Sequence, residues 1–257
     1  MQAVLLDLDG VLYVEDEPVP GSVEAVAALR DAGPGLRFVT NTTQRSRGRT
    51  LDKLGRLGFA VAPDELITPA TLAVEHCHDR GHERVALLMN DDVKADFAGL
   101  AESGDRVDAV IVGDLGERFD YAVLNRAFRH LLDGAELVAL QRNRYWRRAD
   151  GLALDVGPFV AALEYAAGAE AVVVGKPAPA FFHLALSQLG VEPQHAAMIG
   201  DDVESDVIGA VRAGLRGVLV RTGKFRPDTA AAADPAPTAI VDSIADVPAL
   251  IARLPAP

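Results

Sequence analysis

Cysteine, lysine and long apolar runs are all scarce in this sequence of 257 residues. The single cysteine, Cys77, excludes an intrachain disulfide, which fits a reducing cytoplasm. No apolar run approaches the roughly 18 residues that suggest a membrane span. Residues 1–10 carry acids where a signal peptide would carry bases. We therefore expect a cytoplasmic protein with no membrane partner.

Basic residues are also outnumbered, with 25 Lys and Arg against 37 Asp and Glu, a net charge of -12. Such a surface repels nucleic acid on average, so we expect no nucleic-acid partner. An anionic substrate would need locally gathered positive charge. The 49% of apolar residues and 24% of charged ones are typical of a soluble globular protein.

Short apolar runs alternate with amphipathic stretches along most of the chain. This alternation predicts an α/β fold, a doubly wound, mostly parallel sheet covered on both faces. Such sheets bind ligands at the carboxyl ends of their strands. The expected strands are 3–6, 36–40, 171–174, 196–199, 217–220 and an edge strand at 239–241. The expected helices are 22–32, with Ser22 as its N-cap, 47–57, 69–80, 179–189 and 204–213.

The middle of the chain, roughly residues 82–170, has an alternation of its own. Strands are expected at 85–89, 107–112 and 136–140, and helices at 121–132 and 159–167. About 90 residues suffice for a small second domain. The segment 230–237 is low in complexity and is expected to be a surface loop.

Two acids follow the first apolar strand, in the order Asp7-Leu8-Asp9-Gly10. Alternate residues of an extended chain point the same way, so both carboxylates are expected at the carboxyl end of the strand. Gly10 permits a sharp turn there. An acidic turn without chemistry is the simpler alternative. An EF-hand loop does not fit, because the remaining oxygen ligands are missing at the required spacing.

A second acidic set follows the expected strand 196–199, with Asp201 at its end and Asp206 in the next helix. Taken alone, these acids could simply favour the N-terminus of that helix. If the two strands are neighbours, four carboxylates crowd one sheet edge and repel each other without a cation. Oxygen ligands favour Mg²⁺ over zinc.

Three further polar residues end expected strands. Lys176 is notable because only 4 of the 25 basic residues are lysines, and it could neutralise Asp7 and a bound phosphate. Thr40 and Asn41 could donate to phosphate oxygens, although a turn or helix cap explains them equally well. A surface lysine in a turn is the alternative for Lys176.

These strand ends, in this order, resemble the haloacid dehalogenase superfamily of phosphotransferases. The matching pieces are Asp7-Leu8-Asp9-Gly10, Thr40-Asn41, Gly175-Lys176-Pro177, and Gly200-Asp201-Asp202 with Asp206. The resemblance implies a Rossmann-like core at 1–80 and 171–257, with an inserted α/β cap of the C2 type at 81–170, as in subfamily IIA. The segments around Trp146, Gly151 and Gly157 look closest to the branch that includes phospholysine phosphohistidine inorganic pyrophosphate phosphatase.

The resemblance also implies roles for the matching residues. Asp7 would be the nucleophile and a magnesium ligand, and Asp9 the general acid and base, with its backbone carbonyl on the metal. Asp201 would be the other protein ligand, supported by the neighbouring Asp206 and Asp202. Thr40, Asn41 and Lys176 would bind the phosphoryl oxygens.

The expected function is therefore a Mg²⁺-dependent phosphatase acting on a small phosphate ester, phosphoamide or pyrophosphate through an aspartyl-phosphate. A phosphotransferase or mutase on the same core, or a non-catalytic phospho-ligand-binding protein, remains an alternative. The physiological substrate does not follow from the residues. Related capped enzymes often dimerise through the cap, so the resemblance favours a homodimer.

Two other clusters attract attention. One cluster consists of basic residues around Tyr145 and Trp146, namely Arg142, Arg144, Arg147 and Arg148. This segment could be an exposed hairpin of the cap, or it could help shape the substrate entrance. His76, Cys77, His78 and His82 resemble a soft metal site only superficially, because residues two apart on a helix do not face each other. We expect this second cluster to be an ordinary surface.

Overall fold

The computed structural model describes residues 1–148 and 151–254, without the side chains of residues 146–148. Asp150, and the side chains of Trp146, Arg147 and Arg148, therefore lie outside the described residues. Contacts divide the chain into two units. The first unit contains Met1–Thr40, Gly48–Ile67 and Lys176–Pro257, and the second contains Asn41–Arg47 and Thr68–Gly175.

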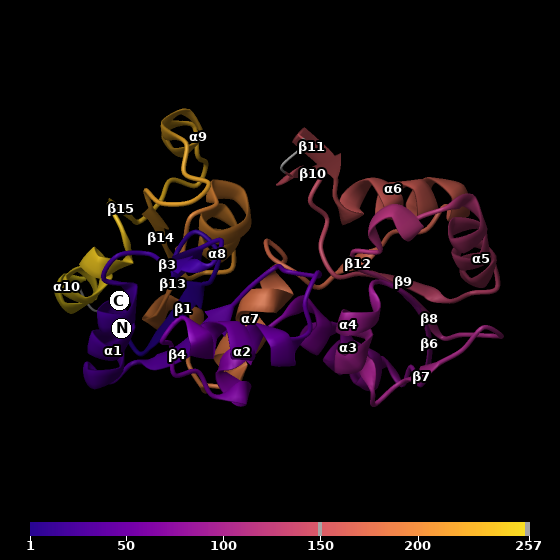
Figure 1. Ribbon diagram of the computed structural model, residues 1–257, viewed down its shortest axis with the longest axis horizontal. Helices are drawn as coiled ribbons and strands as arrows, with labels where there is room; N and C mark the ends of the chain where they lie inside the picture. The colour runs from indigo at the N-terminus through magenta and orange to yellow at the C-terminus, as the bar shows by residue number, and fades with distance from the viewer. Residues whose placement is uncertain (149–150, 255–257) are drawn as a thin grey trace. The chain divides into compact units, whose positions relative to one another are not determined.

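The first unit is built on a six-stranded sheet in which every pair of neighbours is parallel (Figure 1). In sheet order its strands are β15 (Ala239–Val241), β14 (Arg216–Val220), β13 (Ala196–Gly200), β1 (Ala3–Asp7), β4 (Gly35–Val39) and β5 (Leu66–Ile67). A hairpin of β2 (Tyr13–Val14) and β3 (Glu17–Pro18) follows β1. The predicted doubly wound α/β class is confirmed.

The helices of the first unit lie between these strands along the chain, except that α10 follows the last strand. They are α1 (Ser22–Asp31), α2 (Arg47–Arg56), α7 (Pro179–Ser187), α8 (Gly209–Arg212), α9 (Pro227–Ala231) and α10 (Val247–Arg253). Single turns of 3-10 helix lie at Pro63–Glu65, Pro193–His195 and Ile244–Asp246, and a π-helix, η5, spans Val203–Ile208.

Strand β1 is buried along its whole length, which explains its continuous apolar run. Val4 and Leu6 pack into a cluster with Leu29 of α1 and Ile251 of α10. Leu5, between them, is equally buried and points to the opposite face of the sheet. Burial on both faces fixes β1 at the centre of the sheet, so its carboxyl end carries Asp7 to a defined place.

The second unit has its own five-stranded parallel sheet. In sheet order its strands are β12 (Val172–Val173), β9 (Glu136–Ala139), β8 (Ala109–Val112), β6 (Arg84–Leu88) and β7 (Ala101–Glu102). Its helices are α3 (Pro69–Arg80), α4 (Asp91–Lys94), α5 (Tyr121–Leu132) and α6 (Val156–Ala167), with 3-10 turns at Ala95–Phe97 and Gly116–Arg118. A separate antiparallel hairpin pairs β10 (Tyr145–Arg148) with β11 (Gly151–Leu154).

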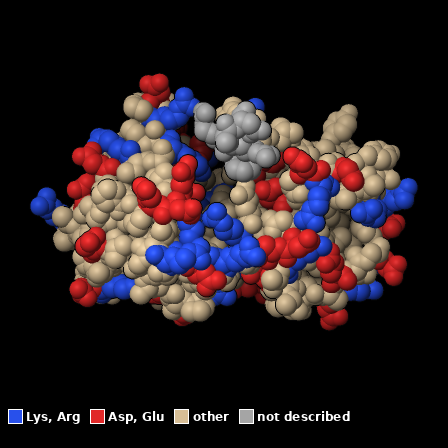
Figure 2. Space-filling model, viewed as in Figure 1, with Lys and Arg blue, Asp and Glu red and all other residues tan. Residues whose placement is uncertain are grey.

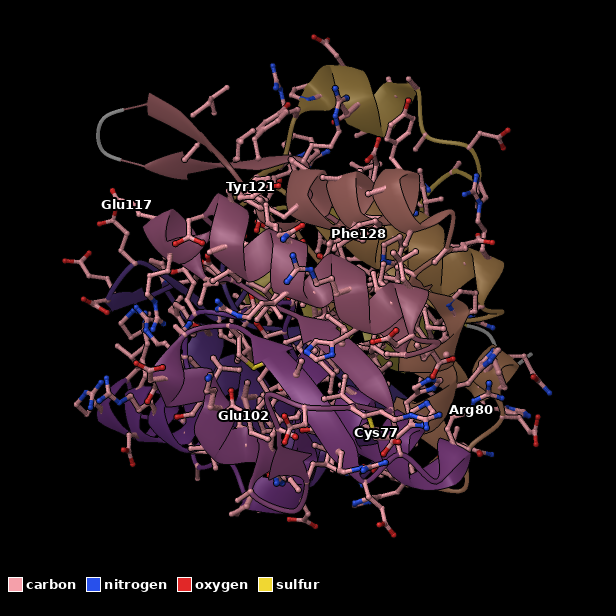
Figure 3. The ribbon with its side chains drawn as sticks, turned by 90° about the vertical axis from the view of Figure 1, so that its right-hand side faces the viewer. Cys77, Arg80, Glu102, Glu117, Tyr121 and Phe128 are labelled. Atoms are coloured by element: carbon pink, nitrogen blue, oxygen red, sulfur yellow. The ribbon has the colours of Figure 1, made fainter. Side chains whose placement is uncertain are left out.

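The core of the second unit lies between its sheet and the pair α5 and α6. Val110 and Val112 of β8 pack with Leu131 of α5 and with Val160 and Leu163 of α6. Figure 3 shows α5 from the side, with Tyr121 at its beginning and Phe128 farther along. The second unit therefore has a hydrophobic core of its own.

Two expectations about the fold of the first unit differ from the structure. The strand expected at 171–174 was assigned to the main sheet, but β12 pairs with β9 of the second unit, because Val172 and Val173 align with Val138 and Ala139. Ser22 is not an N-cap; Gly21 takes that position and Ser22 is already helical and buried. The domain division at 80/81 and 170/171 stays a prediction; the contact units group Asn41–Arg47, α3 and residues 171–175 with the second unit.

Candidate active site

Asp7 is the last residue of β1, between the ends of β13 and β4. Its side chain is buried, and the Lys176 ammonium lies 2.5 Å from Asp7 Oδ1. Burial raises the pKa of Asp7 to about 7, against the opposing attraction of Lys176 and with the help of the nearby Asp206 charge. A buried acid with a shifted pKa beside a cation is a candidate for chemistry.

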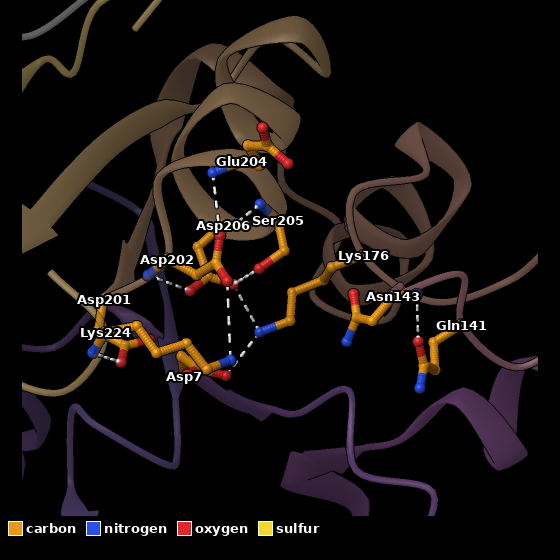
Figure 4. Close-up of polar contacts among 10 residues, drawn as sticks. All are labelled: Asp7, Gln141, Asn143, Lys176, Asp201, Asp202, Glu204, Ser205, Asp206 and Lys224. Carbon is orange, nitrogen blue, oxygen red and sulfur yellow. Dashed lines mark hydrogen bonds and ion pairs between the residues drawn. The ribbon is translucent and has the colours of Figure 1, made fainter. Parts of the chain in front are cut away.

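Lys176 joins two acids from different parts of the chain. Its Nζ lies 2.7 Å from Asp206 Oδ1 as well as beside Asp7 (Figure 4). Burial alone would lower its pKa, but the two carboxylates outweigh that effect and hold the pKa above its usual range. The lysine is therefore a permanent positive charge between the two acids.

Asp201 follows β13 directly and is almost completely buried. Its Oδ2 accepts a hydrogen bond of 2.7 Å from the Lys224 backbone N–H, whereas the buried Oδ1 has no hydrogen-bond partner among the described residues. Burial and the charges of Asp7 and Asp206 raise the pKa of Asp201 to about 8. An unpartnered buried carboxylate oxygen is costly unless a cation or water meets it.

Asp206 belongs to the π-helix η5, a form of helix that is common at functional sites. It accepts hydrogen bonds from the Asp202 backbone N–H at 3.2 Å and from the Ser205 hydroxyl at 3.3 Å. Asp202 is the N-cap of η5, and its Oδ1 accepts from the backbone N–H groups of Glu204 and Ser205. Asp202 therefore fixes the start of the helix that carries Asp206.

Asp7, Asp201 and Asp206 each offer a carboxylate oxygen within 4.8 Å of the others. Three acids this close repel each other, and Lys176 balances only part of their charge. An all-oxygen ligand set with the unpartnered Asp201 Oδ1 fits a hard divalent cation such as Mg²⁺. The cluster is thus chemically suited to a magnesium ion.

Three further residues were predicted for the site, and each has a different environment. Asp9 is exposed and forms an isolated bridge with Tyr13. Thr40 is buried just after β4, and its backbone N–H donates to the Ile67 carbonyl at 3.2 Å. Asn41 groups with the second unit, where its side chain lies beside Gly175.

Reasoning from the sequence missed Lys224. This residue follows β14 and adds a second ammonium near the acids, 3.6 Å from Asp202 Oδ2. A signal was available, since Lys224 is one of only 4 lysines and follows an apolar strand, as Lys176 does. A lysine shortly after the expected strand 217–220 predicts a positive charge at the same edge of the sheet.

The histidine cluster has a structural role. His76 and His82 both hydrogen-bond to Glu136 Oε2, at 2.9 and 2.7 Å. Cys77, expected at the surface, is instead buried, and burial raises the pKa of its thiol to about 11. The expectation failed because α3 turns this side inward; Figure 3 shows Cys77 and Arg80 on the second unit.

On the side visible in Figure 2, a contiguous group of basic side chains lies near the centre of the view, with groups of acidic side chains on either side of it. None of the described helices combines the length and apolar character needed to cross a bilayer.

A parallel α/β sheet with a lysine-bridged acid cluster at its carboxyl edge, together with a second α/β unit inserted in the chain, defines a class of hydrolases. Residues 4–101 match the family described as haloacid dehalogenase-like hydrolase, and residues 173–247 match a second, HAD-hydrolase-like model. The chain belongs to the haloacid dehalogenase-like hydrolase family.

Curated relatives align along most of the chain. Haloacid dehalogenase-like hydrolase domain-containing protein 2 of Homo sapiens is 47% identical over 92% of this chain and 90% of its own length. Phospholysine phosphohistidine inorganic pyrophosphate phosphatase of Homo sapiens is 44% identical over 88% of this chain and 85% of its own. The resemblance to this branch is confirmed.

Solved structures agree over nearly the whole chain. A 4-nitrophenylphosphatase from Thermotoga maritima superposes with a TM-score of 0.90, at 26% identity, covering 98% of this chain and 97% of that one. A glycerol phosphate phosphatase from Mycobacterium tuberculosis in complex with magnesium has a TM-score of 0.84, at 30% identity, covering 95% and 76%.

Proposed function

We propose that this chain is a Mg²⁺-dependent phosphatase that hydrolyses a small phosphate ester, phosphoamide or pyrophosphate through an aspartyl-phosphate on Asp7. Its membership among the haloacid dehalogenase-like hydrolases, with phosphatases among its relatives, supports phosphatase chemistry. The observation that carries the proposal is the position of Asp7, a buried carboxylate at a strand end, paired with Lys176.

Asp7 is suited to act as the nucleophile. An ionised carboxylate needs no base to attack, and phosphoryl transfer mainly requires positioning and charge neutralisation. A carboxylate oxygen of Asp7 forms a bond to phosphorus as the bond from phosphorus to the leaving group breaks. Lys176 holds Asp7 in place and offers positive charge to the phosphoryl oxygens.

Asp9 provides the proton transfers. As an acid it gives a proton to the departing group, and as a carboxylate it then takes a proton from the water that attacks phosphorus. The bond between phosphorus and Asp7 breaks in this second step, which releases phosphate and restores the Asp7 carboxylate. Asp9 is exposed, so its carboxyl group is accessible to both the leaving group and water.

Asp7 and Asp201, with the backbone carbonyl of Asp9, would hold the magnesium ion. When bound, Mg²⁺ supplies positive charge that offsets the acids and the phosphoryl oxygens. Asp206 and Asp202 keep Lys176 and the start of η5 in place around these ligands. Thr40 and Asn41 would donate to the phosphoryl oxygens.

The first prediction tests this function. Purified protein should release phosphate from some of a panel of pyrophosphate, glycerol phosphate, 4-nitrophenyl phosphate and phospholysine in the presence of Mg²⁺. Excess EDTA should abolish release, and Asp7→Asn, which keeps the shape but not the charge, should lower kcat by at least about 1,000-fold.

Two further measurements separate the alternatives. In Asp9→Asn, mass spectrometry after acid quenching should detect one phosphoryl group on the peptide that contains Asp7. Full activity of Asp7→Asn would refute the mechanism. Transfer to an added alcohol in preference to water would identify a phosphotransferase, and binding without turnover of any panel member would identify a phospho-ligand-binding protein.

A further inference from the structure

Two backbone loops meet at one oxygen of Asp201. The Lys224 backbone N–H donates to Asp201 Oδ2 at 2.7 Å, as Figure 4 shows. A Cβ atom placed on Gly223 would lie 2.1 Å from the same oxygen, and one placed on Gly10 would lie 2.0 Å from it. The loops after β14 and β1 therefore both press against Asp201 Oδ2.

Both positions require glycine for two reasons. Non-bonded Cβ contacts under 3.0 Å essentially never occur, so either side chain would displace the carboxylate or the loop. Gly10 and Gly223 also have φ values of +85° and +59°, a region that residues with a Cβ rarely adopt. The close approach is thus built into the sequence at both loops.

A hydroxyl ties the two loops together. Thr222 Oγ1 donates a hydrogen bond to the Gly10 carbonyl. Thr222 and Lys224 thereby connect the loop after β14 to Gly10 on one side and to Asp201 on the other. The two oxygens of Asp201 therefore have different surroundings. The loops hold Oδ2, whereas Oδ1 is buried with no hydrogen-bond partner in the part of the chain that the structure describes.

We infer that Thr222-Gly223-Lys224 is the positioning segment of the cation site: it holds Asp201 Oδ2 so that Oδ1 faces the bound metal. A carboxylate in water loses rotational freedom when it binds a cation, and a preorganised one has already lost it. Groups that orient metal ligands typically contribute about 10–100-fold in metal affinity. The inference rests on the proposed function only in requiring that the acid cluster bind Mg²⁺.

At Gly223 and Lys224 the segment acts through its backbone, and this separates its action from that of the Lys224 side chain. Replacing Lys224 by Met keeps the N–H that holds Asp201 but removes an ammonium 3.6 Å from Asp202 Oδ2. Loss of a positive charge near a cation site increases its attraction for Mg²⁺. Lys224→Met should therefore bind Mg²⁺ at least as tightly as wild type, whereas Gly223→Ala should bind it more weakly.

The test is calorimetric titration of Mg²⁺ into the metal-free, full-length protein without substrate. Gly223→Ala should raise the Kd for Mg²⁺ by about 10-fold or more. Gly190→Ala is the matched control, since Gly190 has a similar φ of +64° and open space where the Cβ would lie. It should lose thermal stability through the same backbone strain and keep the wild-type Kd.

Equal Mg²⁺ affinity in Gly223→Ala and wild type, or an equal loss in Gly190→Ala, would overturn the inference. If Gly223→Ala does not fold, Thr222→Val decides: it should raise the Kd, and Thr222→Ser, which keeps the hydroxyl, should restore it. If the wild-type protein releases phosphate in an Asp7-dependent manner and the variants bind Mg²⁺ as tightly as wild type does, the positioning role alone is refuted. Wild-type protein that binds no Mg²⁺ would refute the metal site itself.

Discussion

At the scale of single residues, the site combines charged groups, each of which would destabilise the folded protein if it were buried alone. Asp7, Asp201 and Asp206 are buried together, and Lys176 is buried between two of them. Breaking one member of such a set leaves the others uncompensated. The cluster therefore couples stability to protonation and to metal binding, and both couplings can be measured.

The pH dependence of the metal-free protein follows from the raised pKa values of Asp7 and Asp201. Both start from 3.8 and rise to about 7 and about 8 on folding, so the folded chain holds more protons than the unfolded chain between these limits. The free energy of unfolding must then fall as pH rises through this range. Well below pH 3.8 both states are protonated and the effect is absent.

Asp201→Asn should reveal this contribution. In EDTA at pH 8 the variant should exceed wild type in free energy of unfolding by at least about 1.4 kcal/mol, the equivalent of one pKa unit. Near pH 4 the difference should be much smaller, because the unfolded pKa of 3.8 is then close to the pH. Urea denaturation at the two pH values measures it, with the exposed Asp52→Asn as a control that changes little. A variant less stable than wild type at pH 8 would contradict the prediction.

Lys176→Met should be strongly destabilising. It leaves the Asp7 and Asp206 carboxylates buried without their shared cation, a change that typically costs about 3–5 kcal/mol. Adding Asp206→Asn to this variant should recover part of the loss, because one of the two unpaired charges is then removed. Denaturant unfolding of the two single variants and the double variant gives the coupling energy; strictly additive effects would refute the bridge.

At the scale of elements, the turn from β13 into η5 determines where Asp206 lies. A Cβ on Gly200, the last residue of β13, would lie 2.2 Å from the Asp206 Cβ. The π-helical turn thus passes against the strand end with room for hydrogen only. Strand end and helix start act as one element that holds two acids.

Gly200→Ala should disturb this element. Overpacking of this kind typically costs about 1–3 kcal/mol, and the displaced Asp206 should lower kcat in the same variant. Gly48→Ala, on an exposed position of α2 with open space around the Cβ, is the control and should be neutral or stabilising. Denaturation measures the free energy of unfolding, and phosphate release measures kcat. Wild-type values of both quantities in Gly200→Ala would show that Asp206 does not need its present position.

At the scale of the whole molecule, the chain forms two units with separate sheets and separate cores. The second unit includes Asn41–Arg47, held there by hydrogen bonds of 2.9 Å from Ser46 N–H to Asp92 and from Asn90 to the Thr43 carbonyl at 3.1 Å. Such self-contained packing is typical of an independent domain.

The homodimer remains a prediction, to be tested by light scattering.

Residues 68–175, expressed alone, should fold. The fragment contains the complete five-stranded sheet with α3, α5 and α6. It should show one cooperative thermal transition and well-dispersed amide signals in NMR. Val160→Asp, which buries a charge in its core, should abolish both. A wild-type fragment without a cooperative transition would show that the second unit depends on the first.

The sequence by itself determined the class of fold and most of the chemical groups of the candidate site. Apolar runs and the acids that follow them are local patterns, so the strands ending at Asp7 and Asp201 were predictable from their neighbours in the chain. The resemblance in four short motifs added the family, with Asp7 as the implied nucleophile and Asp9 as the implied general acid and base. Local patterns also set the bounds of α3 and α5 correctly.

Only the tertiary structure decided which of these groups meet. The strand before Lys176 was predicted to join the main sheet, yet β12 pairs with β9 and the lysine still reaches Asp7, 169 positions away in the chain. The same holds for the loop at Thr222–Lys224, whose backbone reaches Asp201 and Gly10. Strand pairing and backbone approach depend on contacts between distant segments, which side-chain periodicity does not encode.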